Sequence, residues 1–223
     1  MTSGRLVLFD LDHTLLSGDS DVLWCDFLMD KGLLERAAFA QRNADMDARY
    51  RAGVVGAQEF ADFYVGTLAG KSPAQWEALR REFMATQVAP RIPAAALDLV
   101  KRHRDAGDLA VMTTATNRFI TELTALHFGI EHLLATEPEV RDDLFTGRCN
   151  GTLNMRTGKV ERLHEWLAAR SQALADFDSV AYSDSINDLP LLEAVNEPVV
   201  VDPDARLEVI AQERGWRLLR MHA

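Results

Sequence analysis

The sequence predicts an α/β protein with a doubly wound, parallel, Rossmann-like sheet and an inserted bundle of helices. Two observations support this fold class. From residue 94 onward, short apolar segments alternate with helical ones, which is typical of parallel sheets built from β-α-β units. The opening segment, residues 5–9, is apolar without alternation, as expected for a strand that is covered on both faces. We therefore predict a core domain of residues 1–16 and 91–223, and a helical cap domain of residues 17–90.

Four helices are predicted within the insert. Glycines follow the first three, at Gly32, Gly53 and Gly70, and the second of them spans residues 35–51. The fourth helix begins at the sequence SPAQ, residues 72–75, where Ser72 is a helix N-cap, proline takes the first helical position and glutamine completes a capping box.

The remaining elements alternate along the chain. Helices are expected at 94–106, 118–128, 160–170 and 203–214, and strands at 109–113, 133–136, 179–183, 198–201 and 216–220. Glycines interrupt residues 142–158, which indicates hairpins or loops.

Composition excludes several classes of protein. The net charge of −10 disfavours a nucleic-acid partner, because phosphate backbones bind basic surfaces. No stretch approaches the ~20 apolar residues of a membrane span, and residues 1–5 lack the apolar core of a signal peptide. We therefore expect a cytoplasmic protein. Its two cysteines, Cys25 and Cys149, are expected to be free thiols.

The first candidate site follows the first strand, in the sequence FDLDHT of residues 9–14. Carboxylates at Asp10 and Asp12 are costly to bury together unless a cation or hydrogen bonds compensate them. Mg²⁺ prefers such oxygen ligands together with phosphate oxygens. One carboxylate could attack phosphorus, and the other could transfer the proton of the leaving group. An ordinary Asp-rich turn is the alternative.

Two further candidates come later in the chain. A hydroxyl at the end of the second strand, Thr113 or Thr114, could bind a phosphate oxygen, and we prefer Thr114, with Asn117 beside it at the start of a helix. Lys159 at the head of another helix could neutralise a phosphoryl group. A solvated surface lysine is the alternative interpretation of Lys159.

The last candidate is the sequence SDSIND, residues 183–188, which follows another predicted strand. Asp184 could complete a Mg²⁺ site, or cap the following helix, and the two roles are compatible. Asp188 would lie one helical turn further on, where it could orient metal-bound water or Lys159.

This order of motifs resembles the haloacid dehalogenase superfamily over nearly the whole chain. The resemblance implies that Asp10 is the nucleophile of a phosphatase and Asp12 its general acid and base. It implies Mg²⁺ held by Asp10, Asp184 and the main-chain carbonyl of Asp12. It also implies that Thr114 and Lys159 bind phosphate, with Asp188 in support.

The insert resembles the cap of the phosphoserine-phosphatase-like branch of the superfamily. Within that branch, several stretches are similar to bacterial histidinol-phosphate phosphatases: residues 9–16, 18–21, 115–119 and 182–192. Asp19 and Asp21 stand where phosphoserine phosphatases carry a glutamate, and an acidic entry to the cap suits an amine without a carboxylate. L-Histidinol phosphate is therefore the expected substrate. Asp19 and Asp21 could equally cap the next helix.

Other functions stay open at this point. Phosphoserine phosphatase activity and phosphoryl transfer to an alcohol would use the same chemistry on a small phosphorylated metabolite. A phospholigand-binding module without catalysis would need a decayed site. A nucleotide-binding oxidoreductase is disfavoured, since no GxGxxG follows the first strand. A monomer and a homodimer are equally compatible with the sequence.

Overall fold

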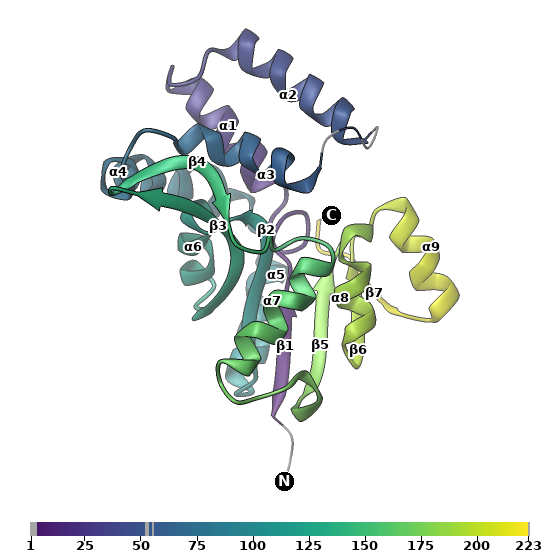
Figure 1. Ribbon diagram of the computed structural model, residues 1–223. Helices are drawn as coiled ribbons and strands as arrows, with labels where there is room; N and C mark the ends of the chain where they lie inside the picture. Colours follow the sequence, from purple (N-terminus) through teal and green to yellow (C-terminus); the bar gives the residue numbers. More distant parts are fainter. Residues whose placement is uncertain (1–3, 52–53, 55, 223) are drawn as a thin grey trace.

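The computed structural model describes residues 4–51, 54 and 56–222, and is built around one seven-stranded sheet (Figure 1). The strand order is β4-β3-β2-β1-β5-β6-β7. The strands are β1 (Arg5–Phe9), β2 (Leu109–Asn117), β3 (His132–Arg141), β4 (Leu144–Asn150), β5 (Asp178–Ser183), β6 (Glu197–Val201) and β7 (Arg217–Leu219).

The sheet is doubly wound, as the sequence predicts. All neighbouring strands run parallel except β3 and β4, which form an antiparallel hairpin. The chain runs outward from β1 in both directions, so β2 and β5 lie on either side of it. Ligands bind at such a switch point, beyond the carboxyl ends of the strands.

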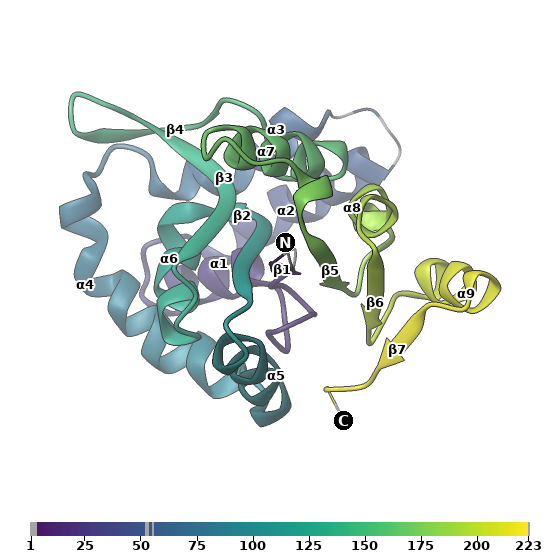
Figure 2. The ribbon, with the colours of Figure 1, turned by 90° about the horizontal axis from the view of Figure 1, so that it is seen from below.

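Helices cover both faces of the sheet, as Figure 2 shows. On one face lie α5 (Ala94–Asp105) and α6 (Arg118–His127), and on the other α7 (Thr157–Ala168), α8 (Leu189–Ala194) and α9 (Ala205–Arg214). The residues of β1 alternate between two buried clusters: Val7 and Phe9 belong to the first, Leu6 and Leu8 to the second. Burial on both faces explains why this strand is apolar without alternation.

The insert is helical, with α1 (Ser20–Asp30), α2 (Arg36–Arg51), α3 (Ala57–Val65) and α4 (Pro73–Phe83). The capping box predicted for α4 is present, since Ser72 and Gln75 bond reciprocally. A π-helical turn, Met84–Val88, continues α4 and was not predicted. Gly53, expected to end the second helix, lies outside the described residues.

An aromatic cluster holds the insert together. The ring of Trp24 in α1 packs edge-on against Phe83 and Trp76 of the α4 segment, with centroids 5.1 and 5.6 Å away. Such edge-to-face pairs add about 0.5–1.5 kcal/mol beyond the burial of their area. The indole of Trp76 donates to the carbonyl of Leu68. These contacts join residues far apart in the sequence, so α1 and α4 stabilise each other.

The hairpin of β3 and β4 belongs to the predicted core domain but bonds directly to the insert. The main-chain groups of Phe145 in β4 bond to Gly70 and Lys71 of the insert. The sequence indicated only hairpins or loops here, and β3 extends well beyond the predicted 133–136. Residues 142 and 143, both at positive φ, form its turn. The division into core and cap at residues 16 and 91 remains our proposal.

Two linkers join the insert to the sheet, and they touch each other. The amide of Ser17 donates to the carbonyl of Arg91 at 2.9 Å. Beside them, the ring of His222 contacts Ser17 Oγ through Nδ1 at 2.5 Å and the carbonyl of Thr14 through Nε2 at 3.0 Å. Within the part of the chain that the structure describes, no helix has the length and apolar character needed to cross a bilayer.

Candidate active site at the ends of β1, β2 and β5

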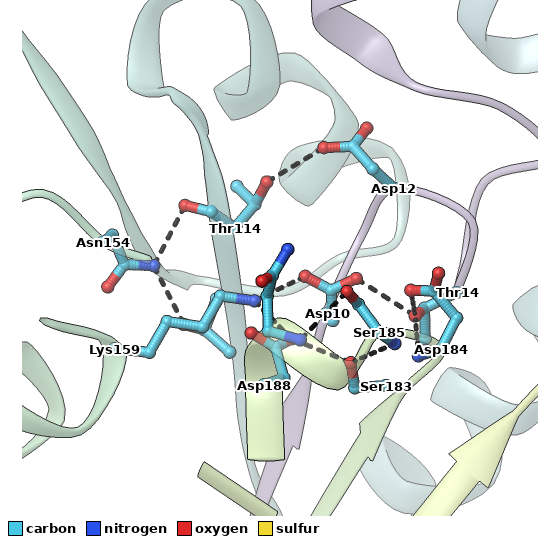
Figure 3. A network of polar contacts seen from close by, with 12 residues as sticks. Asp10, Asp12, Thr14, Thr114, Asn154, Lys159, Ser183, Asp184, Ser185 and Asp188 are labelled. Atoms are coloured by element: carbon cyan, nitrogen blue, oxygen red, sulfur yellow. Dashed lines mark hydrogen bonds and ion pairs between the residues drawn. The ribbon is translucent and has the colours of Figure 1, made fainter. Parts of the chain in front are cut away.

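Most of the candidate residues converge on one cavity of about 770 Å³ at the carboxyl ends of the central strands. Six carboxylates belong to its lining: Asp10, Asp12, Asp19, Asp21, Asp184 and Asp188. The lining also includes Lys159 and, from α3 of the insert, Phe60 and Tyr64. Figure 3 shows the polar network at its floor, with Asp10 between Lys159 and Asp184.

Asp10 sits directly past β1, where its amide still bonds to the carbonyl of Tyr182 in β5. One carboxylate oxygen, Oδ1, accepts from Lys159 Nζ at 2.6 Å. The other, Oδ2, lies 3.0 Å from Thr14 Oγ1. Burial raises the pKa of Asp10 to about 7, and the charges of Asp188 and Asp12 add to this, so the attraction of Lys159 is outweighed.

Lys159 is held between two carboxylates. Its ammonium also donates to Asp188 Oδ2 at 2.6 Å, which in turn accepts from Ser183 Oγ at 2.8 Å. Its side chain is 2% exposed, so the surface-lysine alternative is wrong. Burial would lower the pKa of Lys159, but the attraction of Asp10 and Asp188 raises it above its ordinary value. The amine is therefore a fixed positive charge.

The preceding residue, Gly158, permits this placement. A Cβ added at Gly158 would lie 2.0 Å from the main-chain oxygen of Leu153, which is inside any van der Waals contact. The loop before α7 therefore approaches the helix start at a distance that only glycine allows, and this loop positions Lys159.

The hydroxyl of Thr14 links the carboxylates of Asp184 and Asp10. Thr14 Oγ1 lies 2.9 Å from Asp184 Oδ1 and accepts the main-chain N–H of Asp184 at 3.0 Å. Burial, followed by the charge of Asp10, raises the pKa of Asp184 to about 8. The alternative interpretation of Asp184 as a helix cap is wrong, since Ser185 caps the 3₁₀ turn Ile186–Asp188.

The charges of this cluster fit a divalent cation. Asp10, Asp184 and Asp188 carry three negative charges when ionised, and Lys159 supplies one positive charge within the same bonded network. The two charges left over would be neutralised by one Mg²⁺ on oxygen ligands. Among the described residues, no group of three His, Cys, Asp or Glu side chains is arranged to hold a metal. Asp10 and Asp184, which the hydroxyl of Thr14 links, are the carboxylates that could contribute oxygens to such a site.

Asp12 has other partners than Asp10, in α1 and β2. Its Oδ1 accepts the amide of Ser20 at 2.7 Å, and its Oδ2 accepts the hydroxyls of Thr116 at 2.9 Å and Thr114 at 3.2 Å. Burial and the nearby charge of Asp19 raise the pKa of Asp12 to about 6. A carboxyl with a pKa close to neutral can both donate and accept a proton.

The two threonines considered at the end of β2 face different neighbours. Thr113 Oγ1 accepts from the amide of Asn154, whereas Thr114 Oγ1 donates to Asp12. Thr114 is fully buried, and Thr116 is the threonine of β2 that lines the cavity. The register of β2 against β3 shifts between Thr114 and Asn117, which brings Thr116 to the site.

Asn117 starts α6, as expected, but it lies outside the cavity lining. Its side chain is buried and accepts the amide of Ile120, so it caps α6 and is not part of the cavity lining. A role for Asn117 in phosphate binding is therefore not supported. Asn154, which the sequence did not single out, ties the loop before α7 to β2 and β3 by donating to Thr113, Thr114 and Leu134.

Asp19 and Asp21 enter the cavity from the start of α1. Asp19 accepts the amide of Val22 and so caps the helix, and it also lines the cavity. Its role in binding a substrate amine stays a prediction. Asp21 Oδ2 lies 3.3 Å from Thr116 Oγ1. Burial, together with the charges of Asp19 and Asp12, raises the pKa of Asp21 well above its usual range. This wall of the cavity is strongly acidic.

Three basic side chains of the lining were missed in the sequence: His13, Arg156 and Arg206. The first two have positive φ angles of 57° and 51°, a region that costs non-glycine residues energy and often marks functional sites. No local pattern places them at the site: His13 and Arg156 lie in irregular segments, and Arg206 lies in the first turn of α9, whose position at the cavity depends on the whole fold.

Comparison with known proteins gives consistent similarities. The family model described as haloacid dehalogenase-like hydrolase matches residues 7–193. A histidinol-phosphatase of Neisseria meningitidis serogroup C is 39% identical over 96% of this chain and 98% of its own. The phosphoserine phosphatase SerB1 of Mycobacterium tuberculosis is 33% identical over 94% of this chain and 68% of its own. A protein of unknown function from Bordetella pertussis Tohama I superposes with a TM-score of 0.94 at 47% identity, covering 98% of this chain and 99% of that one.

The raised pKa values predict how stability depends on pH. Asp10 and Asp184 have pKa values of about 7 and about 8 in the folded protein, well above those of an unfolded chain. Their contribution is greatest at low pH and is lost as pH rises through 7 to 8. Without metal, we expect Tm to fall by at least about 3 °C between pH 6 and pH 9, the effect of about 1 kcal/mol in a chain of this size.

Thermal unfolding in EDTA or in MgCl₂, at matched ionic strength, measures this effect. Mg²⁺ should raise Tm most at pH 9, and Asp184→Asn should reduce both the pH slope and the Mg²⁺ effect. A metal-free Tm that rises from pH 6 to pH 9 would contradict the prediction.

Replacing Gly158 tests whether the loop before α7 positions the lysine. In Gly158→Ala, the clash with Leu153 must be relieved by moving the loop or the helix start. We expect kcat/KM for any hydrolysed phosphate ester to fall at least about tenfold, which is about 1.4 kcal/mol of lost transition-state stabilisation. Gly56→Ala is the matched control, because a Cβ there meets nothing within 4 Å and its φ is −76°. Equal activity of both variants would overturn this role of the loop.

Proposed function

Because this chain belongs to the haloacid dehalogenase-like hydrolase family, we propose that it hydrolyses small phosphate monoesters through a phosphorylated Asp10, with Mg²⁺ as cofactor. The family and its phosphatase relatives make it a phosphoric monoester hydrolase. The observation that carries the mechanism is the position of Asp10, whose carboxylate contacts a buried ammonium at 2.6 Å at the floor of the cavity.

In the first half-reaction, a carboxylate oxygen of Asp10 forms a bond to phosphorus as the bond to the leaving alcohol breaks. Asp12 gives its proton to the departing oxygen. Lys159 stays charged throughout and attracts the phosphoryl oxygens, because its pKa lies above its ordinary value.

In the second half-reaction, Asp12 accepts a proton from water, whose oxygen attacks the phosphorus of the aspartyl phosphate. Inorganic phosphate leaves and Asp10 is restored. The pKa of Asp12, raised to about 6, suits a group that must act as an acid and then as a base. Thr114 and Thr116 hold this carboxyl in place by donating to Oδ2.

The side chains of Asp10 and Asp184 and the main-chain carbonyl of Asp12 would hold Mg²⁺. When bound, the ion supplies positive charge that offsets the negative charge of the phosphate and of the carboxylates. The hydroxyl of Thr14 supports this arrangement because it bonds to the carboxylates of both Asp10 and Asp184.

The proposed substrate is L-histidinol phosphate. The acidic wall of Asp12, Asp19 and Asp21 would attract the ammonium group of an amino alcohol and repel a carboxylate. The near full-length similarity to a histidinol-phosphatase supports this choice. We also propose a cytoplasmic location, where the free thiols of Cys25 and Cys149 stay reduced.

Phosphoserine is the second candidate. Arg156 and Arg206 line the same cavity and offer positive charge that a substrate carboxylate would need. The 33% sequence identity to a phosphoserine phosphatase also favours it. Transfer of the phosphoryl group to an alcohol in place of water would use the same phosphorylated Asp10, and added acceptor alcohols would reveal it as a new phosphate ester.

The nucleophile is tested by Asp10→Asn, which keeps the shape of the side chain and removes its charge. We expect kcat to fall by at least about 10³-fold, since neither half-reaction can occur without the carboxylate. Asp98→Asn on the exposed side of α5 is the matched control and should keep full activity. Activity of the Asp10 variant near that of the control would refute the assignment.

The substrate is tested by measuring phosphate release from L-histidinol phosphate and L-phosphoserine side by side, with Mg²⁺ and with EDTA. We expect kcat/KM to favour histidinol phosphate by at least about 100-fold, equivalent to about 2.7 kcal/mol, and to require the metal. A preference for phosphoserine would keep the chemistry and reject the role given to the acidic wall.

A further inference from the structure

A second cavity adjoins the first, between helices of the insert. It has a volume of about 480 Å³ and is bounded by α1, α2 and α3, which lie together at the top of Figure 1. Asp19, Phe60 and Tyr64 line both cavities, so the two spaces meet at these residues. The phosphoryl chemistry described above uses no residue that belongs to the second cavity alone.

The walls of the second cavity suit a ring. Phe39 and Phe60 contribute aromatic surface from α2 and α3, and Val22 and Met29 contribute aliphatic surface from α1. Hydrogen-bonding groups stand among them: Tyr64 donates its hydroxyl to Asn43 Oδ1 at 3.0 Å. Ligand sites commonly combine apolar and aromatic walls with a few polar groups in this way.

The charge of these walls has one sign. Asp19 and Asp26 belong to the lining, which contains no lysine, arginine or histidine within the described ranges. An anionic group would therefore be repelled there, while a neutral or positively charged ring with N–H donors would be attracted. The basic residues Arg156 and Arg206 line only the first cavity.

The two cavities place three kinds of surface in order. Lys159 and Asp10 mark the phosphoryl end, the carboxylates of Asp19 and Asp21 stand at the entry to the insert, and the aromatic cavity lies beyond. A phosphate ester of a 2-amino alcohol carries its groups in the same order: phosphate, ammonium and side chain.

We propose that the second cavity is the subsite for the side chain of the leaving amino alcohol, and that it selects a planar ring with N–H donors. This inference rests on the proposed phosphatase function and specifies its substrate class. Substrates with a short side chain leave the subsite empty and gain nothing from it. The residues that set specificity are then those of α2 and α3, such as Phe39, Ala40 and Phe60.

Filling the subsite tests the proposal. Ala40 and Ala44 lie one helical turn apart on α2 and both line the second cavity, so Ala40→Leu and Ala44→Leu reduce its volume. Ala37→Leu is the matched control, because Ala37 is as exposed as Ala40 and Ala44 on the same helix but lies outside both linings. Each protein is assayed on L-histidinol phosphate and on L-alaninol phosphate, which lacks the ring but keeps the phosphate and the ammonium group.

The measured quantity is the ratio of kcat/KM for the ring-bearing ester to that for the ring-less ester. We expect the wild-type protein and Ala37→Leu to share one high ratio, and the two filled variants to lower it at least about tenfold. General damage to the fold would reduce both activities and leave the ratio unchanged, so an unchanged ratio in a filled variant overturns the proposal. Wild-type hydrolysis of alaninol phosphate as fast as histidinol phosphate also overturns it. Hydrolysis of neither ester would instead count against the proposed substrate class.

Discussion

The buried contact of Lys159 with Asp10 and Asp188 is the interaction on which the rest of the site depends. Removing one member would leave an uncompensated charge away from water, which costs several kcal/mol. The contact also joins three separate elements: the end of β1, the start of α7 and the 3₁₀ turn after β5. A parallel sheet places those ends side by side at its switch point. The strand order of the sheet therefore brings together the residues of this contact.

A second constraint is the balance of charge around that contact. Carboxylates outnumber ammonium groups at the floor of the cavity, and burial holds the pKa values of Asp10 and Asp184 near or above neutrality. The carboxylates of Asp12 and Asp21 form a separate acidic wall, connected through the hydroxyl of Thr116. The site is therefore divided into a part that suits a cation with phosphate and a part that suits an amine.

The fold and the acidic residues could be predicted because both depend on local sequence. An apolar strand that stops at Asp10 or Asp184 is visible within a few residues. The contact of Lys159 with Asp10 spans 149 positions along the chain, so no local pattern reveals that this lysine is buried. Asn117 starts a helix as predicted, but the irregular register at the end of β2 brings Thr116, and not Asn117, to the cavity. Asn154 acts through carbonyls of other strands, and nothing in its own segment indicates that role.

The burial of Lys159 has a practical consequence for labelling and immobilisation. The chain has four lysines, and the other three, Lys31, Lys71 and Lys101, are at least partly exposed to solvent. Amine-reactive dyes and coupling reagents need an accessible, unprotonated amine, which Lys159 does not offer while it is enclosed by two carboxylates. The protein can therefore be attached to a sensor surface through lysine with its candidate nucleophile and the neighbouring ammonium untouched.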